Sequence, residues 1–340
     1  MPSKKPTPKP ISLNEEQRAV VGARSGFFQV LAGPGAGKSA CLVARFAALV
    51  EEGVSPDDIL SLSFTKTAAR NLRDRVEAQV GKLSINRTGA GAVTFHSLAL
   101  SFAQEERNEF GFELAEFPLA TEPAANKFAG DAARRHDLDY RTLRASVSLW
   151  KRRRISPRQA VRDAEHKLDA KQLKLALAYQ TYQKKLVENG VLDFDSLIYE
   201  MVEILDKRHE VRERWKRDWL QLDESQDMSK IEWDLARLVS GISVLAVGDV
   251  SQGIYGFRGS DPKLFASMSE IFPGTRTMYL ATNYRSTPEI IDFIRPIAAT
   301  KELALKFHTH NQSGPLPKIQ GFLTPNDEAA WVVARIKESV

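Results

Sequence analysis

Residues 32–39 of this sequence read AGPGAGKS, a run of small residues that ends in a lysine and a hydroxyl side chain. Glycines at this density let backbone N–H groups surround a phosphate without obstruction from Cβ atoms. In such a loop Lys38 would reach the β- and γ-phosphates, and the Ser39 hydroxyl would ligate Mg²⁺. A glycine-rich structural turn is the alternative, but it would have no use for the Lys-Ser pair. The stretch therefore predicts a phosphate-binding loop.

A second stretch, residues 223–227, reads DESQD and follows the apolar segment WLQL. A carboxylate at the end of a buried strand is suited to hold Mg²⁺, and the next carboxylate can orient an attacking water. We therefore expect Asp223 to be a metal ligand and Glu224 to be the catalytic base. An Asp-Glu pair alone more often caps a helix, but the polar residues Gln226 and Asp227 directly after it favour a catalytic role.

A third stretch, residues 247–259, reads VGDVSQGIYGFRG and follows the apolar run SVLAV. Its glutamine, Gln252, is a candidate sensor of the γ-phosphate. Tyr255 and Phe257 offer flat faces on which nucleic-acid bases could stack. The alternative is an aromatic loop that simply packs against the protein.

Short apolar runs alternate with helical patterns on both sides of these stretches, which predicts crossover units and a parallel sheet. The expected class is an α/β fold. Helices are expected at residues 39–52, 68–80, 288–299 and 327–338. The expected strands are Phe27–Ala32, Ile59–Phe64, Ala92–Phe95, Trp219–Leu222, Ser243–Val247 and Thr277–Leu280.

The composition excludes several classes of protein. Of 340 residues, 43% are hydrophobic and 27% are charged, so a disordered or fibrous chain is excluded. A single cysteine, Cys41, excludes an intramolecular disulfide framework and a cysteine-ligated zinc site. No uncharged apolar stretch approaches the ~20 residues of a membrane span, and the N-terminus has no secretory apolar region. We expect a soluble cytoplasmic protein with no membrane partner and with a flexible basic tail at residues 1–10.

The formal net charge of +5 conceals an uneven distribution of charge. Between Asp131 and Lys185 there are 15 lysines and arginines against 6 acidic residues, so the rest of the chain is slightly acidic. This basic block lies in a helix-favouring insertion, residues 97–191, that interrupts the alternating pattern. From charge alone, a lobe that binds a polyanion and a solvated helical surface are equally good interpretations.

The order of the motifs resembles the UvrD/Rep/PcrA group of superfamily 1 DNA helicases. Besides the three stretches above, the resemblance rests on LNEEQ (13–17), FTKTAA (64–69), TFH (94–96), DFD (193–195) and NYRS (283–286). It implies that Gln17 reads adenine, that Tyr284 stacks on it, and that Arg285 is an arginine finger. It also shifts the interpretation of the basic insertion toward DNA contact.

The resemblance assigns roles to three sets of residues. The catalytic set is Lys38, Glu224, Gln252 and Arg285. The nucleotide-binding set is Gln17, Ala32, Gly33, Gly35, Ala36, Gly37, Lys38, Ser39, Ala40 and Tyr284, with Mg²⁺ held by Ser39 and Asp223. The DNA-binding set is Phe64, Thr65, His96, Trp150, Lys151, Arg152, Tyr255, Phe257 and Arg258. Two departures stand out: family members usually carry Arg where Ala40 stands, and often Trp where Phe257 stands.

By the same resemblance, residues 11–96 and 192–280 would form a first RecA-like ATP-binding domain, and residues 281–340 would begin a second one. The implied activity is that of an ATP-dependent helicase or translocase, moving 3′ to 5′ on single-stranded DNA and acting at single-strand/duplex junctions. Motifs V and VI are absent, so we expect a fragment of a longer helicase that hydrolyses ATP weakly. A nucleotide-switched nucleic-acid-binding module and a motor subunit of a helicase–nuclease complex are the alternatives. Protein partners in repair, replication or phage defence stay open.

Overall fold

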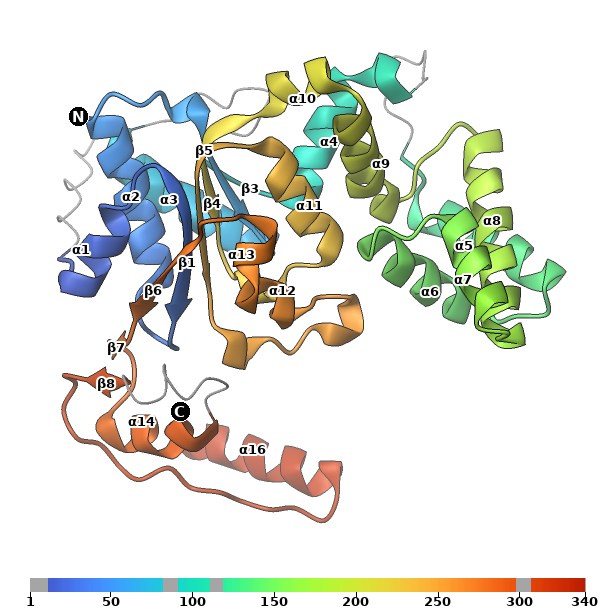
Figure 1. Cartoon of the computed structure of the whole chain (residues 1–340). Coiled ribbons are helices and arrows are strands. Elements are labelled where there is room, and N and C mark those ends of the chain that lie inside the picture. The colour runs from blue at the N-terminus through green and yellow to red at the C-terminus, as the bar shows by residue number, and fades with distance from the viewer. Residues whose placement is uncertain (1–11, 82–90, 111–118, 298–306, 340) are drawn as a thin grey trace, which may run out of the picture.

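A computed structural model describes residues 12–81, 91–110, 119–297 and 307–339; the expected basic tail at residues 1–10 lies outside them. A six-stranded, fully parallel sheet forms the centre, with strand order β3-β2-β4-β5-β1-β6 (Figure 1). The strands are β1 (Gly26–Ala32), β2 (Ile59–Ser63), β3 (Gly91–Thr94), β4 (Arg217–Leu222), β5 (Ser240–Gly248) and β6 (Arg276–Leu280). The predicted α/β class and all six predicted strands are confirmed.

The boundaries differ where capping side chains act. The strand expected to end at Phe95 ends at Thr94, because the Thr94 hydroxyl accepts a hydrogen bond from the Ser97 N–H at 3.1 Å and starts α4 (Phe95–Glu105). In the same way Thr65 caps α3 (Lys66–Val80) and leaves Phe64 just beyond β2. Both caps place the following side chains at the carboxyl edge of the sheet.

Helices cover both faces of the sheet (Figure 1). One face packs against α2 (Lys38–Glu51) and α3 through apolar side chains such as Val30, Phe46 and Val247, with α1 (Glu15–Val21) beside them. The other face carries a second core that includes Phe102, Met201 and Trp233. That core is built from α4, α9 (Phe194–Lys207), α10 (His209–Trp215), α11 (Lys230–Val239), α12 (Pro262–Ala266) and α13 (Met268–Ile271). Strands buried on both faces explain the short, mostly apolar runs in the sequence.

Four helices form a lobe beside the sheet (Figure 1). They are α5 (Glu122–Arg135), α6 (Tyr140–Arg152), α7 (Pro157–His166) and α8 (Ala170–Glu188). They share a separate apolar cluster that contains Leu143, Tyr179 and Tyr182. The insertion was expected to begin at residue 97, but α4 packs its apolar side chains into the core of the sheet. Among the described helices, the inserted lobe with its own apolar cluster therefore begins at α5, and α4 belongs to the sheet domain.

The C-terminal part of the chain, from β7 onward, lies below the sheet in Figure 1, near the edge that carries the glycine-rich loop. Strands β7 (Thr282–Asn283) and β8 (His308–Thr309) pair in parallel, and Ile291 of α14 (Pro288–Ile294) packs with Phe307. Of the helix expected at residues 288–299, the first part is α14, and a short 3₁₀ turn (Arg295–Ile297) follows it. Residues 298 and 299 lie outside the described part. The last expected helix is α16 (Pro325–Ser339). No helix in the described ranges is long and apolar enough to cross a membrane.

Candidate nucleotide and nucleic-acid sites

The glycine-rich loop joins β1 to α2 and has a backbone that requires glycine. Gly35 and Gly37 have φ angles of +68° and +82°. A Cβ atom on Gly37 would lie 2.7 Å from Nε2 of Gln17, which donates a hydrogen bond to the Ala36 carbonyl at 3.1 Å. Gln17 is itself fixed by a capping box with Asn14 at the start of α1. The helix bearing the predicted adenine reader is therefore tied directly to the phosphate-binding loop.

The lysine of the loop meets the acidic stretch across the sheet edge. Lys38 is the first residue of α2, and its Nζ lies 2.7 Å from Oε2 of Glu224. Glu224 has a left-handed backbone (φ 49°) directly after β4, which turns the chain sharply at this point. Ser39 and Ala40 follow in the first turn of α2. The predicted phosphate ligand and the predicted base thus form an ion pair.

Two further carboxylates lie beside this pair in an environment that disfavours their charge. Burial, reinforced by the charge of Glu224, raises the pKa of Asp223 to about 6. The same two causes raise the pKa of Asp227 to about 6, and its buried Oδ1 has no hydrogen-bond partner. Both carboxylates would gain from a nearby cation.

The residues fit a magnesium ion that is held mainly by a bound nucleotide. No group of three or more His, Cys, Asp or Glu side chains in the described ranges could hold a metal ion by itself. Mg²⁺ usually takes only one or two protein oxygens together with phosphates and waters. A hydroxyl at Ser39 and a buried carboxylate at Asp223 match that requirement.

The raised pKa of Asp223 predicts a pH-dependent effect on stability. A carboxyl whose pKa is raised by folding contributes stability below the pKa of the unfolded chain, and that contribution is lost as the pH rises through about 6. With a chelator present, Asp223→Asn should therefore unfold with a higher free energy than wild type at pH 8. This advantage should shrink by about 1.4 kcal/mol at pH 5, one unit below the raised pKa, as measured by urea unfolding. An advantage independent of pH would contradict the assignment.

A chain of hydrogen bonds links Glu224 to the loop after β5. Nε2 of Gln226 donates to Glu224 at 3.1 Å, and its Oε1 accepts from the Asp249 N–H at 2.9 Å. Asp249 in turn accepts from Nε2 of Gln252 at 2.6 Å. The predicted base and the predicted γ-phosphate sensor are therefore connected through two intermediate side chains.

The segment after β7 lies against the glycine-rich loop. The Tyr284 N–H donates to the Gly35 carbonyl at 3.0 Å, and Nδ2 of Asn283 donates to the Pro34 carbonyl at 2.5 Å. A Cβ on Gly35 would come within 2.8 Å of the Arg285 Cβ. Tyr284 and Arg285 are exposed here. The structure thus brings both residues to the glycine-rich loop; the adenine contact of Tyr284 and the arginine-finger role of Arg285 stay predictions.

The start of the loop is closely packed as well. Ala32, the last residue of β1, is fully buried. A Cβ on the next residue, Gly33, would lie 2.3 Å from the Phe307 ring. Only glycine allows Phe307 to cover this part of the loop.

Aromatic side chains line a groove between the sheet edge and α6, which we call the aromatic groove. It encloses about 370 Å³. The rings of Phe64 and Tyr255 are 5.5 Å apart, and those of Tyr255 and Phe257 are 6.1 Å apart. Arg258 lies over both Tyr255 and Phe257, and the Phe257 side chain is 78% exposed. The walls are Phe64, Thr65, Lys66, Thr94, His96, Ala145, Ser148, Leu149, Arg152, Phe194, Glu232, Phe257 and Arg258.

His96 lies in the wall of the groove, stacked on Phe194 at 4.0 Å and 6°. Burial, with the charges of Arg152 and Lys66, lowers the pKa of His96 to about 3, so the imidazole is neutral at physiological pH. It can therefore contact DNA through stacking or a neutral hydrogen bond, and it adds no positive charge.

The wall of the aromatic groove that α6 forms packs against the loop that follows β5. Gly259 has φ +84°, and a Cβ there would lie 3.2 Å from Leu149 and 3.3 Å from Arg152, both on α6. The loop that carries Gln252 and the helix of the inserted lobe are thus in contact at a residue without a side chain.

A family model described as the UvrD/REP helicase N-terminal domain matches residues 13–273. The chain belongs to this family. The matched span contains the glycine-rich loop, the acidic stretch and the residues of the aromatic groove, and it confirms the predicted family and the RecA-like sheet as its core.

Two relatives of this UvrD/REP chain carry the name ATP-dependent DNA helicase PcrA. It is 29% identical to the protein from Staphylococcus epidermidis over 337 residues and 28% identical to that from Staphylococcus aureus over 336 residues. These matches cover 96% and 95% of this chain but 45% of each relative. The chain therefore spans less than half the length of the relatives it matches.

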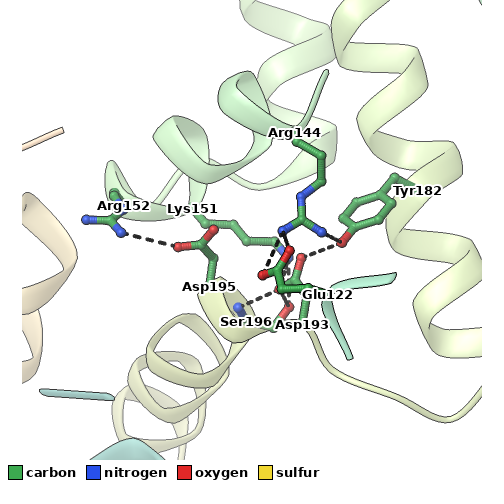
Figure 2. A network of polar contacts seen from close by, with 8 residues as sticks. All are labelled: Glu122, Arg144, Lys151, Arg152, Tyr182, Asp193, Asp195 and Ser196. Atoms are coloured by element: carbon green, nitrogen blue, oxygen red, sulfur yellow. Dashed lines mark hydrogen bonds and ion pairs between the residues drawn. The ribbon is translucent and has the colours of Figure 1, made fainter. Parts of the chain in front are cut away.

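The structure corrects the DNA-binding role predicted for two residues of this UvrD/REP chain. Lys151 is 2% exposed, and its Nζ binds Oδ1 of Asp193 at 2.9 Å and the Ser196 hydroxyl at 2.7 Å (Figure 2). Trp150 stacks on Tyr179 in the lobe's own core, with ring centroids 5.5 Å apart, and is not among the lining residues of the groove. The buried and paired Lys151 ammonium is therefore not placed to meet DNA, and the half-buried Trp150 ring is used to pack α6 against α8 outside this groove.

Removing the buried ammonium should destabilise the fold without a specific effect on DNA. Lys151→Met leaves Asp193 buried without its counter-charge, and such a loss costs about 3–5 kcal/mol of unfolding free energy. The double variant Lys151→Met/Asp193→Asn should recover most of this loss, because Asn can still cap α9. Urea unfolding measures both changes. A loss below 1 kcal/mol, or a selective fall in DNA affinity at full stability, would contradict this buried role.

Several residues that organise the two sites were not predicted. Asp249, Gln226 and Asn283 position the predicted side chains, and Arg154 binds Glu203 at 2.9 Å to hold α6 against α9. The positions of Asn283 and Gln226 inside the motif stretches were a usable signal. For Arg154 the sequence held no usable signal, because its partners lie about fifty residues away.

Proposed function

We propose that this chain is the ATP-binding and single-strand-binding part of an ATP-dependent DNA helicase. ATP would bind at the carboxyl edge of the sheet, with Lys38 on its terminal phosphates and Gln17 and Tyr284 at the adenine. Single-stranded DNA would bind in the aromatic groove. Translocation from 3′ to 5′ is part of the proposal by family resemblance.

The observation that carries the proposal is a second groove, of about 460 Å³, that joins the two sites. We call it the carboxylate groove. Its walls include Glu224, Gln226, Asp227 and Gln252 of the nucleotide side together with Phe64, Thr65 and Tyr255 of the DNA side. Because Phe64 and Thr65 line both grooves, a rearrangement at the nucleotide would reach surfaces that a base would contact. A nucleotide switch unrelated to nucleic acid would not need aromatic side chains in this position.

Each residue of the nucleotide site would have its own role in ATP hydrolysis. On ATP binding, Lys38 would leave Glu224 for the phosphates, which frees the Glu224 carboxylate to accept a proton from an attacking water. Gln252 would contact the γ-phosphate, and Arg285 would stabilise the charge that develops on it. Mg²⁺, held by Ser39, Asp223 and the nucleotide, would neutralise phosphate charge.

We also propose a domain organisation for the chain. The first RecA-like domain would comprise residues up to α4 and residues from α9 to β6. The inserted DNA-binding lobe would comprise α5 to α8, which have their own core. The segment from β7 onward would belong to a second RecA-like domain, since its strands β7 and β8 pair outside the six-stranded sheet and Phe307 packs with Ile291 of the same segment as well as against Leu31 and Tyr279 of the sheet.

Stacking in the aromatic groove predicts the effect of a single truncation. Phe257→Ala removes an exposed ring and should weaken binding of a fluorescent oligothymidylate by about 5- to 100-fold, since stacking contributes about 1–3 kcal/mol per base. The fold should be unaffected. Fluorescence anisotropy measures the affinity, and ATP hydrolysis with and without the oligonucleotide tests the coupling. Unchanged DNA affinity together with DNA-independent hydrolysis would refute the proposed function.

A further inference from the structure

We propose that Asp195 is an internal competitor for DNA: in the DNA-free protein it occupies the place on Arg152 that a phosphate of single-stranded DNA takes. This inference rests on the proposed DNA-binding function of the aromatic groove. Arg152 lines that groove, and its Nη2 lies 3.6 Å from Oδ1 of Asp195. Figure 2 shows this pair standing apart from the Lys151–Asp193 contacts, with the Arg152 side chain directed away from Arg144 and Tyr182.

Three basic residues at the end of α6 meet acidic residues of the sheet domain, but they are held very differently. Lys151 is buried with two bonded partners, and Arg154 donates to Glu203 and Asp206 at 2.6–3.0 Å. Arg152 has a longer ion pair, and no hydrogen bond to its guanidinium is found within the described ranges. Its side chain is 23% exposed and that of Asp195 is 20% exposed. Of the three, Arg152 carries the charge that can be released to a ligand.

A DNA phosphate can replace the Asp195 carboxylate on Arg152 without leaving a buried charge unpaired. A phosphate offers the same paired oxygen acceptors to a guanidinium as a carboxylate does, so one can replace the other without moving the arginine backbone. The backbone is held in place by Lys151 and Arg154 on either side. Asp195, once released, remains partly solvated in the first turn of α9, where a helix N-terminus favours negative charge. Neither partner is left as a buried unpaired ion.

The other groups that face Arg152 do not compete with Asp195. His96 is neutral, as described above. Glu232 is buried and accepts hydrogen bonds from the Ser229 N–H and hydroxyl, both at 2.7 Å. Among the described side chains around Arg152, Asp195 is therefore the acidic partner that an incoming phosphate displaces.

The test is a double-mutant cycle on the full chain, read by anisotropy of a fluorescein-labelled oligothymidylate. Asp195→Asn should tighten binding by about 3- to 5-fold at low salt, and less at high salt, because the exchange is partly solvated. Arg152→Gln should weaken binding. In the Arg152→Gln background, Asp195→Asn should bring no gain, since the cation that the two anions share is gone.

Matched controls separate the possible outcomes. Glu188→Gln removes the same charge on α8, where Glu188 pairs with Lys184, and should leave DNA affinity unchanged. Asp195→Ser provides a second route if the asparagine variant folds poorly, as judged by thermal melting. Unchanged affinity in both Asp195 variants overturns the inference, and so does a gain that persists with Arg152→Gln, which would indicate general repulsion. If wild type does not bind the oligonucleotide, the proposed function fails and this inference fails with it.

Discussion

Lys38→Ala should lower the affinity for ATP by on the order of 100-fold, because each charge-assisted hydrogen bond to phosphate contributes about 1.5–3 kcal/mol. The variant should still fold. Glu224, the partner of Lys38, has a side chain that is 33% exposed, so the loss of this ion pair should change the unfolding free energy by less than about 1 kcal/mol. Isothermal titration with ATP and Mg²⁺ measures the affinity, and urea unfolding measures the stability.

A matched lysine sharpens the test of Lys38. Lys66 also begins a helix at the carboxyl edge of the sheet, but it lines the aromatic groove. Lys66→Ala should weaken oligothymidylate binding and leave ATP affinity unchanged, the opposite of Lys38→Ala. If both variants bind ATP like wild type, the glycine-rich loop is not the nucleotide site.

Glu224→Gln should reduce ATP hydrolysis by about 10²- to 10⁴-fold, the usual contribution of a positioned general base. ATP affinity should rise by about 3-fold at the same time, because Lys38 no longer has to leave an anionic partner before it meets the phosphates. The combination of tighter binding and lost turnover identifies a base that also restrains the lysine. Hydrolysis is measured with single-stranded DNA present, and affinity by titration.

Asp227→Asn is the comparison for Glu224→Gln. It removes a carboxylate from the same carboxylate groove but leaves the Lys38–Glu224 pair intact. Its hydrolysis rate should stay within about 10-fold of wild type. Equal losses in both variants would mean that local charge, and not a base at Glu224, sets the rate.

The sheet was predictable from the sequence because its strands are buried on both faces and read as short, mostly apolar runs. Val244 to Val247 of β5, for example, are all buried. The boundary between the sheet domain and the inserted lobe was not predictable in this way. Helix α4 (FHSLALSFAQE) follows the last predicted strand of that half without a break in helix-favouring sequence, and the packing of Phe102 into the core of the sheet assigns it to the sheet domain.

Residues for a nucleotide site could be proposed from the sequence because their chemistry is concentrated in short stretches, and the structure brings two of them, Lys38 and Glu224, into contact. The basic run at the end of α6 misled for a physical reason. A charge seen in sequence carries no information about its partner, and Asp193, Asp195 and Glu203 lie about fifty residues further along the chain. Three charges that look available for DNA are instead paired inside the protein, and we propose that one of them is exchanged.

The contact at Gly259 has a mechanical consequence. Because Gly259 adds no side chain of its own, the backbone of this loop packs closely against the Leu149 and Arg152 side chains of α6, and little space is left to absorb a displacement of one relative to the other. We expect the loop that carries Gln252 and the wall of the inserted lobe to move as one stiff linkage. A movement of this loop at the phosphate would then be passed in full to the wall of the aromatic groove. A residue with a side chain at position 259 would hold the loop and α6 apart.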